Sequence, residues 1–496
     1  MSDTEKQPEF TEWRAIFWPI HTFELKKFLP MGFIMLCILF NYSTLRTTKD
    51  SLVVPLCGAE IISALKLWAV LPSAVLIMLL YSKLSNALSK PNLFYTMLSL
   101  FLVFFASFAL FLYPNHESLH PDFSELIGEY PRLKWILLVG EKWTFSLFYV
   151  MAELWGSVVM TLLFWQFAND ITKIKEAKRF YGMFGVIGNV ALLFSGSFIK
   201  KFSSIQSTYP EGTDVWGITI NWLVGASIVS GICIILLYWW MQKNVLTDIR
   251  FYNPDDVKKP KKKKEKLSLL ESFKYIFSSK YVGFIALLPI CYGISINLVE
   301  GVWKGQVGIM FPNHNDYSAF MGQFQIYTGL VSIICMFIGA NILRKFSWYT
   351  AAIVTPLMIL VTGGAFFAFI ICDNAFESML VTMGVTCLAM TVAFGQIQNV
   401  LSKATKYSLF DATKEMSYIP LDDELKMKGK AAVDVVGGRF GKSGGAAVQY
   451  ILLASISGST LVSLAPIMSA IFICVMVLWI WAVSGLSKEF EAVTKA

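Results

Sequence analysis

Apolar residues in this chain are gathered into blocks of about twenty, the length of helix that crosses the hydrocarbon core of a bilayer. Hydrophobic residues make up 55% of the 496 residues and charged residues only 15%, whereas a soluble domain carries roughly a quarter charged residues. The sequence therefore predicts an all-α membrane protein. We place about twelve spans, at 29–48, 63–82, 93–113, 135–168, 180–199, 217–240, 281–301, 319–343, 349–371, 377–401, 432–456 and 461–483.

The connections between these blocks alternate in charge. One set is strongly basic and contains Lys83, Lys90, the segment 173–179, the lysine-rich run 258–266, Arg344, Lys345 and the stretch from Lys403 to Lys430. The other set, at 57–60, 115–130, 209–214 and 372–378, is acidic or neutral. Basic loops stay on the cytoplasmic side, so we expect both termini in the cytoplasm. No cleavable signal sequence is visible, and the first block is expected to remain as a helix.

The two parts of the chain on either side of the lysine run resemble each other. The segments 164–173 and 394–403 share the pattern F-x-Q-x-x-N-x-x-x-K, and each is followed by Arg-Phe and a glycine-rich apolar stretch. This predicts two duplicated six-helix halves, as in major-facilitator-like transporters, whose substrate site lies between the halves. The expected division is 1–28 (cytoplasmic segment), 29–241 (first bundle), 242–280 (basic linker), 281–485 (second bundle) and 486–496 (cytoplasmic tail). We interpret the lysine run as a solvated linker that does not bind nucleic acid.

Several ionisable residues lie in or beside the apolar blocks, where burial costs at least about 2.5–3.5 kcal/mol unless the side chain faces a cavity or a partner. They are Arg46, Lys49, Asp50, Glu141, Lys142, Glu153, Glu300, Lys304, Arg439 and Lys442. Cations predominate at matching points of both halves. Such a set suits a multivalent anion, because Arg binds phosphate bidentately and Lys acts as a point charge.

Other interpretations of these charges remain open. Lys49 and Asp50 form an interfacial pair if the first helix ends near residue 48. Glu153 and Glu300 either pair with the cations in the empty site or hydrogen-bond the ribose or base of a nucleotide.

Two local patterns are rejected as sites. The HESLH stretch at 116–120 matches a zinc motif but is bracketed by Pro114 and Pro121. The FGKSGG stretch at 440–445 lacks the first glycine of a phosphate-binding loop, since position 436 is Val436. Its glycines are expected to let helices approach closely. We expect no metal, no cofactor and no enzymatic activity.

Seven motifs, taken in order, resemble the nucleotide transporters of plastids and of obligate intracellular bacteria, the ATP/ADP translocases. They are LRTTKDSLVV (45–54), AELWGS (152–157), FWQFANDITKIKEAKRFY (164–181), QKNVLTD (242–248), INLVEGVWK (296–304), NVLSKATKYSLFDATKEMSYIPLD (399–422) and KGKAAVDVVGGRFGKSGG (428–445). The resemblance covers nearly the whole chain.

The resemblance implies exchange of external ATP for internal ADP across the bacterial inner membrane. It also implies transport roles for Lys49, Glu153, Glu300 and Lys430, of which Lys430 rests on the resemblance alone. Asn189, at the end of the glycine-rich stretch 179–189, is a further candidate. We expect ATP, ADP and free phosphate as ligands and a monomer as the functional unit. Thr47 replaces an acid found in many members, and proton-coupled import of nucleotides with broader base specificity remains the alternative.

Overall fold

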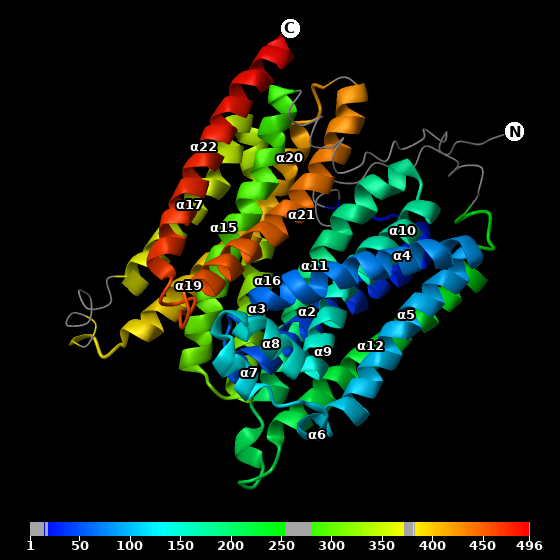
Figure 1. Ribbon diagram of the computed structural model, residues 1–496. Coiled ribbons are helices and arrows are strands. Elements are labelled where there is room, and N and C mark those ends of the chain that lie inside the picture. Colours follow the sequence, from blue (N-terminus) through cyan, green and yellow to red (C-terminus); the bar gives the residue numbers. More distant parts are fainter. Residues whose placement is uncertain are drawn as a thin grey trace, which may run out of the picture.

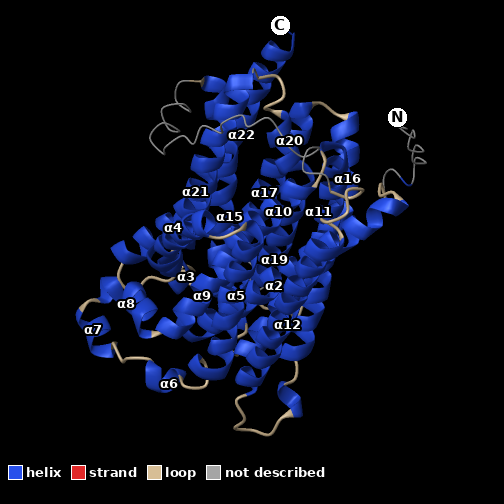
Figure 2. Cartoon of the chain, turned by 90° about the vertical axis from the view of Figure 1, so that its right-hand side faces the viewer, coloured by secondary structure: helices blue, strands red, loops and turns tan. Residues whose placement is uncertain are grey.

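The computed structural model describes Arg14, residues 18–252, 279–371, 380, 382–421 and 423–495. Within these ranges the chain forms helices and their connections, and no strand occurs (Figure 2). Ten of the helical stretches are long and apolar enough to cross a membrane. The prediction of an all-helical membrane protein is therefore confirmed.

The helices before the basic linker include the short η1 (Thr22–Glu24), which leads into α2, Leu25–Cys57, the first crossing. The second crossing joins α3 (Ile61–Ala64), η2 (Leu65–Val70) and α4 (Leu71–Ala87), and the third joins α5 (Lys90–Ser107) and η3 (Phe108–Leu112). After the short helices α6 (His116–Leu119), α7 (Ser124–Glu129), η4 (Pro131–Leu133) and α8 (Lys134–Glu141), the fourth crossing joins α9 (Trp143–Trp155), η5 (Gly156–Phe164) and α10 (Trp165–Ile171). The fifth and sixth are α11 (Ile174–Ser203) and α12 (Val215–Asn244).

The helices after the linker follow the same plan. They are α15 (Lys280–Met310), α16 (His314–Lys345), α17 (Trp348–Ile371), α19 (Cys387–Thr405), η7 (Lys406–Phe410), α20 (Asp411–Met416), α21 (Asp423–Ser455) and α22 (Ala465–Lys495). Part of the predicted crossing 377–401 and most of the predicted linker 242–280 lie outside the described residues.

Several predicted boundaries were wrong, among them the end of the last crossing, which was expected at residue 483 but lies at Lys495. The first helix does not end at residue 48 but continues to Cys57, where Gly58 adopts a φ of 84° that favours glycine. The seventh continues to Met310 rather than ending near 301. The long run 135–168 is broken at Lys142, so that α8 is a separate short helix.

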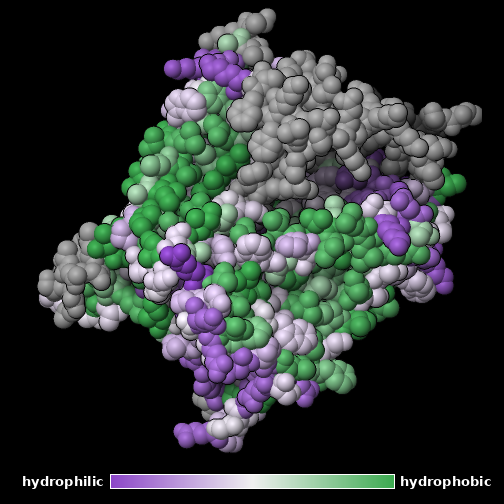
Figure 3. All heavy atoms as spheres, in the orientation of Figure 1, coloured by the Kyte–Doolittle hydropathy of each residue, from purple (hydrophilic) through white to green (hydrophobic). Residues whose placement is uncertain are grey.

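The long helices run between two ends of the molecule (Figure 1). We call the end that holds α6 and α7 the α6 end; the opposite end, where α22 ends, we call the α10 end because α10 lies toward that side of the molecule. The α6 helix and the C-terminus lie at opposite ends in Figures 1 and 2. Hydrophobic side chains cover much of the visible flank, and hydrophilic ones gather toward the α6 end and also at the upper and right-hand edges (Figure 3).

Helices α11 and α16 pack along each other and join the two parts of the chain at a seam of small residues. A Cβ atom at Gly196 would lie 2.6 Å from the carbonyl oxygen of Gly322, and one at Gly329 would lie 2.8 Å from that of Asn189. Only glycine permits backbones to approach this closely. The seam therefore holds the two groups of helices in direct backbone contact.

Candidate functional site

Helices α2 and α15 carry charged residues in their C-terminal halves, where these residues meet and form an ionic centre. Asp50 of α2 is 1% exposed and binds two lysines: Lys49 Nζ lies 2.9 Å from Oδ1, and Lys304 Nζ of α15 lies 2.9 Å from Oδ2. Lys49 is 2% exposed. The alternative of an interfacial Lys49–Asp50 pair is thus wrong, because the helix continues beyond both residues.

Glu300 on α15 is the second carboxylate at this centre. Its Oε1 lies 3.1 Å from Arg46 Nη2 of α2 and 3.2 Å from Lys304 Nζ, one helical turn along α15. Lys403 Nζ of α19 lies 4.0 Å away. Ion pairs between the two parts of the chain therefore run in both directions, from Arg46 to Glu300 and from Lys304 to Asp50.

Glu153 on α9 completes the set of acids. Its Oε1 lies 3.0 Å from Lys49 Nζ. The same ammonium lies 3.6 Å from the ring centroid of Tyr149, also on α9, so that a cation–π contact stabilises it on a further side. Lys49 is thus held by α2 and α9, which both precede the linker.

Two basic residues at this centre were missed in the sequence. Lys66 Nζ of η2 donates to Asn297 Oδ1 of α15 at 2.8 Å, and Lys403 lies over the ring of Phe324 at 4.5 Å. Lys66 lies inside the predicted crossing 63–82. The cost of burying a charge in the membrane, which selected Glu153 as a candidate, therefore applies to Lys66 as well. Lys403 was assigned to a loop because the tenth helix was expected to end at residue 401.

We call this set the cationic cluster; it consists of Arg46, Lys49, Lys66, Lys304 and Lys403 with Asp50, Glu153 and Glu300. Five basic side chains face three carboxylates, so positive charge is in excess. The side chains of Arg46 and Glu153 keep 33% and 29% exposure, which leaves the cluster accessible. A buried, partly accessible site with surplus cations attracts an anion.

The remaining candidates lie elsewhere or are not described. Lys430 on α21 pairs with Glu415 at 2.5 Å and is 44% exposed. Asn189 is buried on α11, where its Nδ2 donates to the carbonyl oxygen of Gly185 at 3.0 Å, and Met336 of α16 lies beside it. The side chains of Arg439 and Lys442 lie outside the described residues.

Glu141 and Lys142 pair with each other at 2.7 Å at the break between α8 and α9. They are not members of the cationic cluster.

The glycines of the 440–445 stretch lie within α21 and face α15. A Cβ at Gly441 would lie 2.6 Å from the carbonyl oxygen of Pro289, and one at Gly445 would lie 2.5 Å from the Cβ of Asn297. The expectation that these glycines allow close helix approach is confirmed.

Contacts between the two parts of the chain close the α6 end. Glu60 is 6% exposed, and its Oε1 accepts a hydrogen bond from the backbone N–H of Leu461 at 2.9 Å. His314 Nδ1 lies 2.6 Å from the carbonyl oxygen of Ser51. By contrast, α4, which leads toward the α10 end, has no buried side chain. These contacts close the α6 end beside the cluster, whereas α4 packs against the core only with partly buried side chains such as Ala74 and Ile77.

Comparison with known sequences identifies the family. The sequence model of the TLC ATP/ADP transporter family matches residues 3–490 of this chain. The chain belongs to the TLC ATP/ADP transporter family. It is 51% identical to ADP,ATP carrier protein 1 of Rickettsia bellii, over 99% of this chain and 98% of that protein. It is 50% identical to ADP,ATP carrier protein 1 of Chlamydia pneumoniae, over 99% of this chain and 96% of that one.

A solved structure shares the fold of this TLC family member. A bacterial homologue of the iron transporter ferroportin, crystallised in an inward-facing state, superposes with a TM-score of 0.60 and covers 93% of this chain and 99% of its own. At 13% identity it supports the fold alone. The major-facilitator-like architecture expected from the sequence is confirmed.

In this family member, Thr47 faces the seam rather than the cationic cluster. Gln325 Nε2 of α16 donates to Thr47 Oγ1 at 2.7 Å and to the carbonyl oxygen of Ser43 at 3.0 Å. Ser195 Oγ of α11 donates to Ser43 Oγ at 2.8 Å. The hydroxyl at position 47 therefore joins a neutral hydrogen-bond network between α2, α11 and α16.

Proposed function

We propose that this protein exchanges external ATP for internal ADP by alternating access. The observation that carries the proposal is the cationic cluster, whose basic side chains come from both groups of helices and outnumber its carboxylates. A polyphosphate needs several cations, whereas a monocarboxylate needs one or two. The relatives in Rickettsia bellii and Chlamydia pneumoniae are ADP,ATP carrier proteins, which supports the same substrates.

In this proposal Arg46, Lys49 and Lys304 bind the phosphates, and Lys66 and Lys403 add charge around them. Asp50 and Glu300 form ion pairs with the basic side chains while no nucleotide is bound, because an unpaired buried charge is costly. When a nucleotide arrives, its phosphates replace these carboxylates as partners. The same anion then bridges α2 and α15.

We propose that residues 29–241 and 281–485 form the two rocking bundles, joined by the linker 242–280 and flanked by the segments 1–28 and 486–496. With the basic connections on the cytoplasmic side, the α10 end is cytoplasmic. The contacts of Glu60 and His314 then close the outer side, which supports an inward-open arrangement. Both termini lie in the cytoplasm of a bacterium, and the protein spans its inner membrane.

The protein exchanges nucleotides because the transporter without a bound nucleotide changes slowly between its inward-open and outward-open states. Without a bridging anion, the basic residues of the two bundles repel one another once their carboxylate partners are pulled apart, so the unloaded protein changes state slowly. Either nucleotide removes that barrier. Free phosphate is a smaller ligand of the same kind, and we expect it to bind more weakly because it reaches fewer cations. The transporter works as a monomer, since one chain supplies both bundles.

Uptake into lipid vesicles tests this function. Purified protein is reconstituted into vesicles that are empty or loaded with ADP, and entry of labelled ATP is measured. Exchange predicts rapid uptake only into ADP-loaded vesicles, unaffected by a protonophore. Equal uptake into empty vesicles, abolished by the protonophore, would contradict it and favour proton-coupled import. Two variants provide a second test. Lys49→Gln is expected to reduce ATP uptake more than Lys430→Gln.

A further inference from the structure

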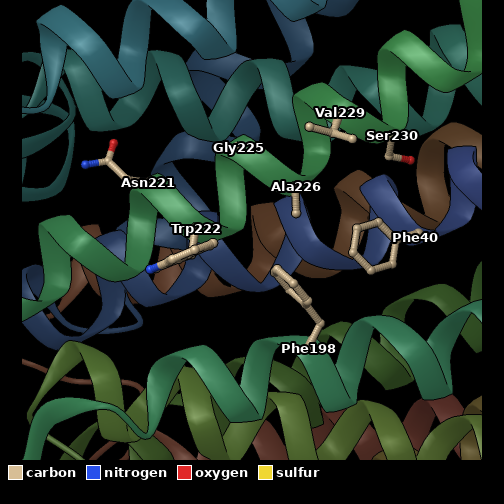
Figure 4. Close-up of a pocket in the computed structure, with 8 residues that line it drawn as sticks. All are labelled: Phe40, Phe198, Asn221, Trp222, Gly225, Ala226, Val229 and Ser230. Carbon is tan, nitrogen blue, oxygen red and sulfur yellow. The ribbon is translucent and has the colours of Figure 1, made fainter. Parts of the chain in front are cut away.

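A groove lies on the outer side of the helices that precede the linker, where α2, α11 and α12 meet, and its lining residues differ from those of the cationic cluster. It has a volume of about 490 Å³, within the range of pockets that hold small molecules. It is lined by Phe40, Phe198, Asn221, Trp222, Gly225, Ala226, Val229 and Ser230 (Figure 4).

The walls of the groove are apolar, and its floor is unfilled. The rings of Phe40 and Phe198 lie 5.8 Å apart, while Trp222 and Val229 are 50% and 61% exposed. A Cβ atom at Gly225 would meet no heavy atom within 4 Å. Because all three helices cross the membrane, hydrocarbon chains of the bilayer surround this opening.

A positive charge lies beyond one end of the groove, next to a ring that stacks on the lining residue Trp222. Lys201, in the last turn of α11, is exposed, and its Nζ lies 5.9 Å from the ring of Phe202. Phe202 in turn stacks on Trp222 at 4.7 Å. Asn221, exposed beside Trp222 in the second turn of α12, adds an amide. Tryptophan and lysine at a helix end are typical of the level of lipid headgroups.

We propose that this groove binds one anionic phospholipid. An acyl chain lies along Phe40, Phe198 and Gly225, and the phosphate is held by Lys201 with Asn221 as a hydrogen-bond donor. The occupant is a lipid rather than a soluble ligand, because the opening faces the hydrocarbon region and its charged residue stands only at one end.

The position of the lipid connects it to the seam. Its apolar wall includes Phe198 of α11, and Gly196, two residues earlier on the same helix, is the residue that contacts the backbone of Gly322. A bound acyl chain therefore packs against α11, the helix that forms the seam with α16. We expect an occupied groove to favour a tightly packed seam.

Native mass spectrometry tests the site with dioleoylphosphatidylglycerol as the anionic probe and dioleoylphosphatidylcholine as the neutral one, added to delipidated protein. We expect the wild type to retain one phosphatidylglycerol about fivefold more strongly than phosphatidylcholine, the preference that one basic residue near the headgroup supplies. Lys201→Gln is expected to remove this preference but not the binding. Gly225→Leu, which places a side chain in the groove, is expected to remove binding of both lipids.

Gly364→Leu on α17 is the matched control, because a Cβ there also meets nothing within 4 Å and the residue lies far along the chain from the groove. It should bind lipid like the wild type. Ala226→Leu provides a second filled groove if Gly225→Leu fails to fold as judged by circular dichroism. Unchanged lipid retention in both filled variants would overturn the site, and equal retention of the two lipids by the wild type would overturn the role of Lys201.

Discussion

The two groups of helices meet in two chemically different ways. Along α11 and α16 the contact is neutral and close-packed, with Gly196 against the backbone of Gly322. Between α2 and α15 the contact is ionic, with Arg46 bound to Glu300 and Lys304 bound to Asp50. A close-packed seam loses its contacts when it opens and gains nothing from a ligand. Ion pairs can exchange one partner for an anion, so the ionic contact is the one that responds to substrate.

The largest expected effect follows from removing the cation that joins both carboxylates. In Lys304→Gln, Asp50 and Glu300 each lose a buried partner, a change that costs about 2–5 kcal/mol. We expect ATP uptake into ADP-loaded vesicles to fall on the order of a hundredfold. Lys83→Gln, an exposed lysine of α4, is the control. Equal uptake by the two variants would show that the ionic contact is dispensable.

A smaller effect is expected at Lys49, whose carboxylate partners Asp50 and Glu153 both precede the linker. Lys49→Gln leaves Lys304 on Asp50, so the link between the two groups of helices persists while one phosphate ligand is lost. A hydrogen bond to a charged group contributes about 1.5–3 kcal/mol, so uptake of ATP and export of ADP should fall together by roughly tenfold or more. A change confined to one nucleotide would argue against a role in phosphate binding.

The neutral seam should respond in stability rather than in substrate binding. Gly322→Leu forces a side chain against the backbone of Lys200, whose nitrogen lies 2.8 Å from the position of a Cβ. Overpacking of this kind costs about 1–3 kcal/mol, and we expect a lower melting temperature in detergent with nucleotide affinity little changed. Gly364→Leu controls for the size of the new side chain. A fully stable Gly322→Leu protein would contradict the tight contact.

Lys430 should show a weaker effect because it lies outside both contacts. Its pair with Glu415 is half-exposed, and exposed pairs contribute about 0–1 kcal/mol. We expect Lys430→Gln to slow uptake by a few-fold at most, and less at high salt because screening weakens a long-range attraction. Loss as large as in Lys304→Gln, independent of salt, would place Lys430 in direct contact with the nucleotide.

The smallest effect concerns His120, at the α6 end and outside the crossings. Burial, with nearby Lys142, lowers the pKa of His120 to about 4, whereas an unfolded histidine titrates near 6.5. The unfolded chain therefore binds more protons between these values, and stability falls as pH drops from about 6.5 to about 4. Melting curves of wild type and His120→Gln should diverge slightly across this window. Parallel curves would show that His120 contributes nothing.

The sequence could predict most of the membrane crossings but not which charges meet. Apolar blocks and the intramembrane cost of charge sufficed to select Lys49, Glu153, Glu300 and Lys304. Lys403 was missed because an uncertainty of a few residues in a helix boundary turns a buried lysine into a loop lysine. Arg46 and Glu300 are 254 residues apart in the sequence, and their pairing depends on the register between α2 and α15, which no local pattern specifies.

The central claim is that one polyphosphate replaces the carboxylates that link α2 and α15. An experimental structure with ADP bound tests it most directly. We expect phosphate oxygens within hydrogen-bonding distance of Lys304 and of Arg46 or Lys49, with the Arg46–Glu300 and Lys304–Asp50 pairs loosened. Phosphates bound by residues of only one group of helices, with both pairs intact, would contradict it.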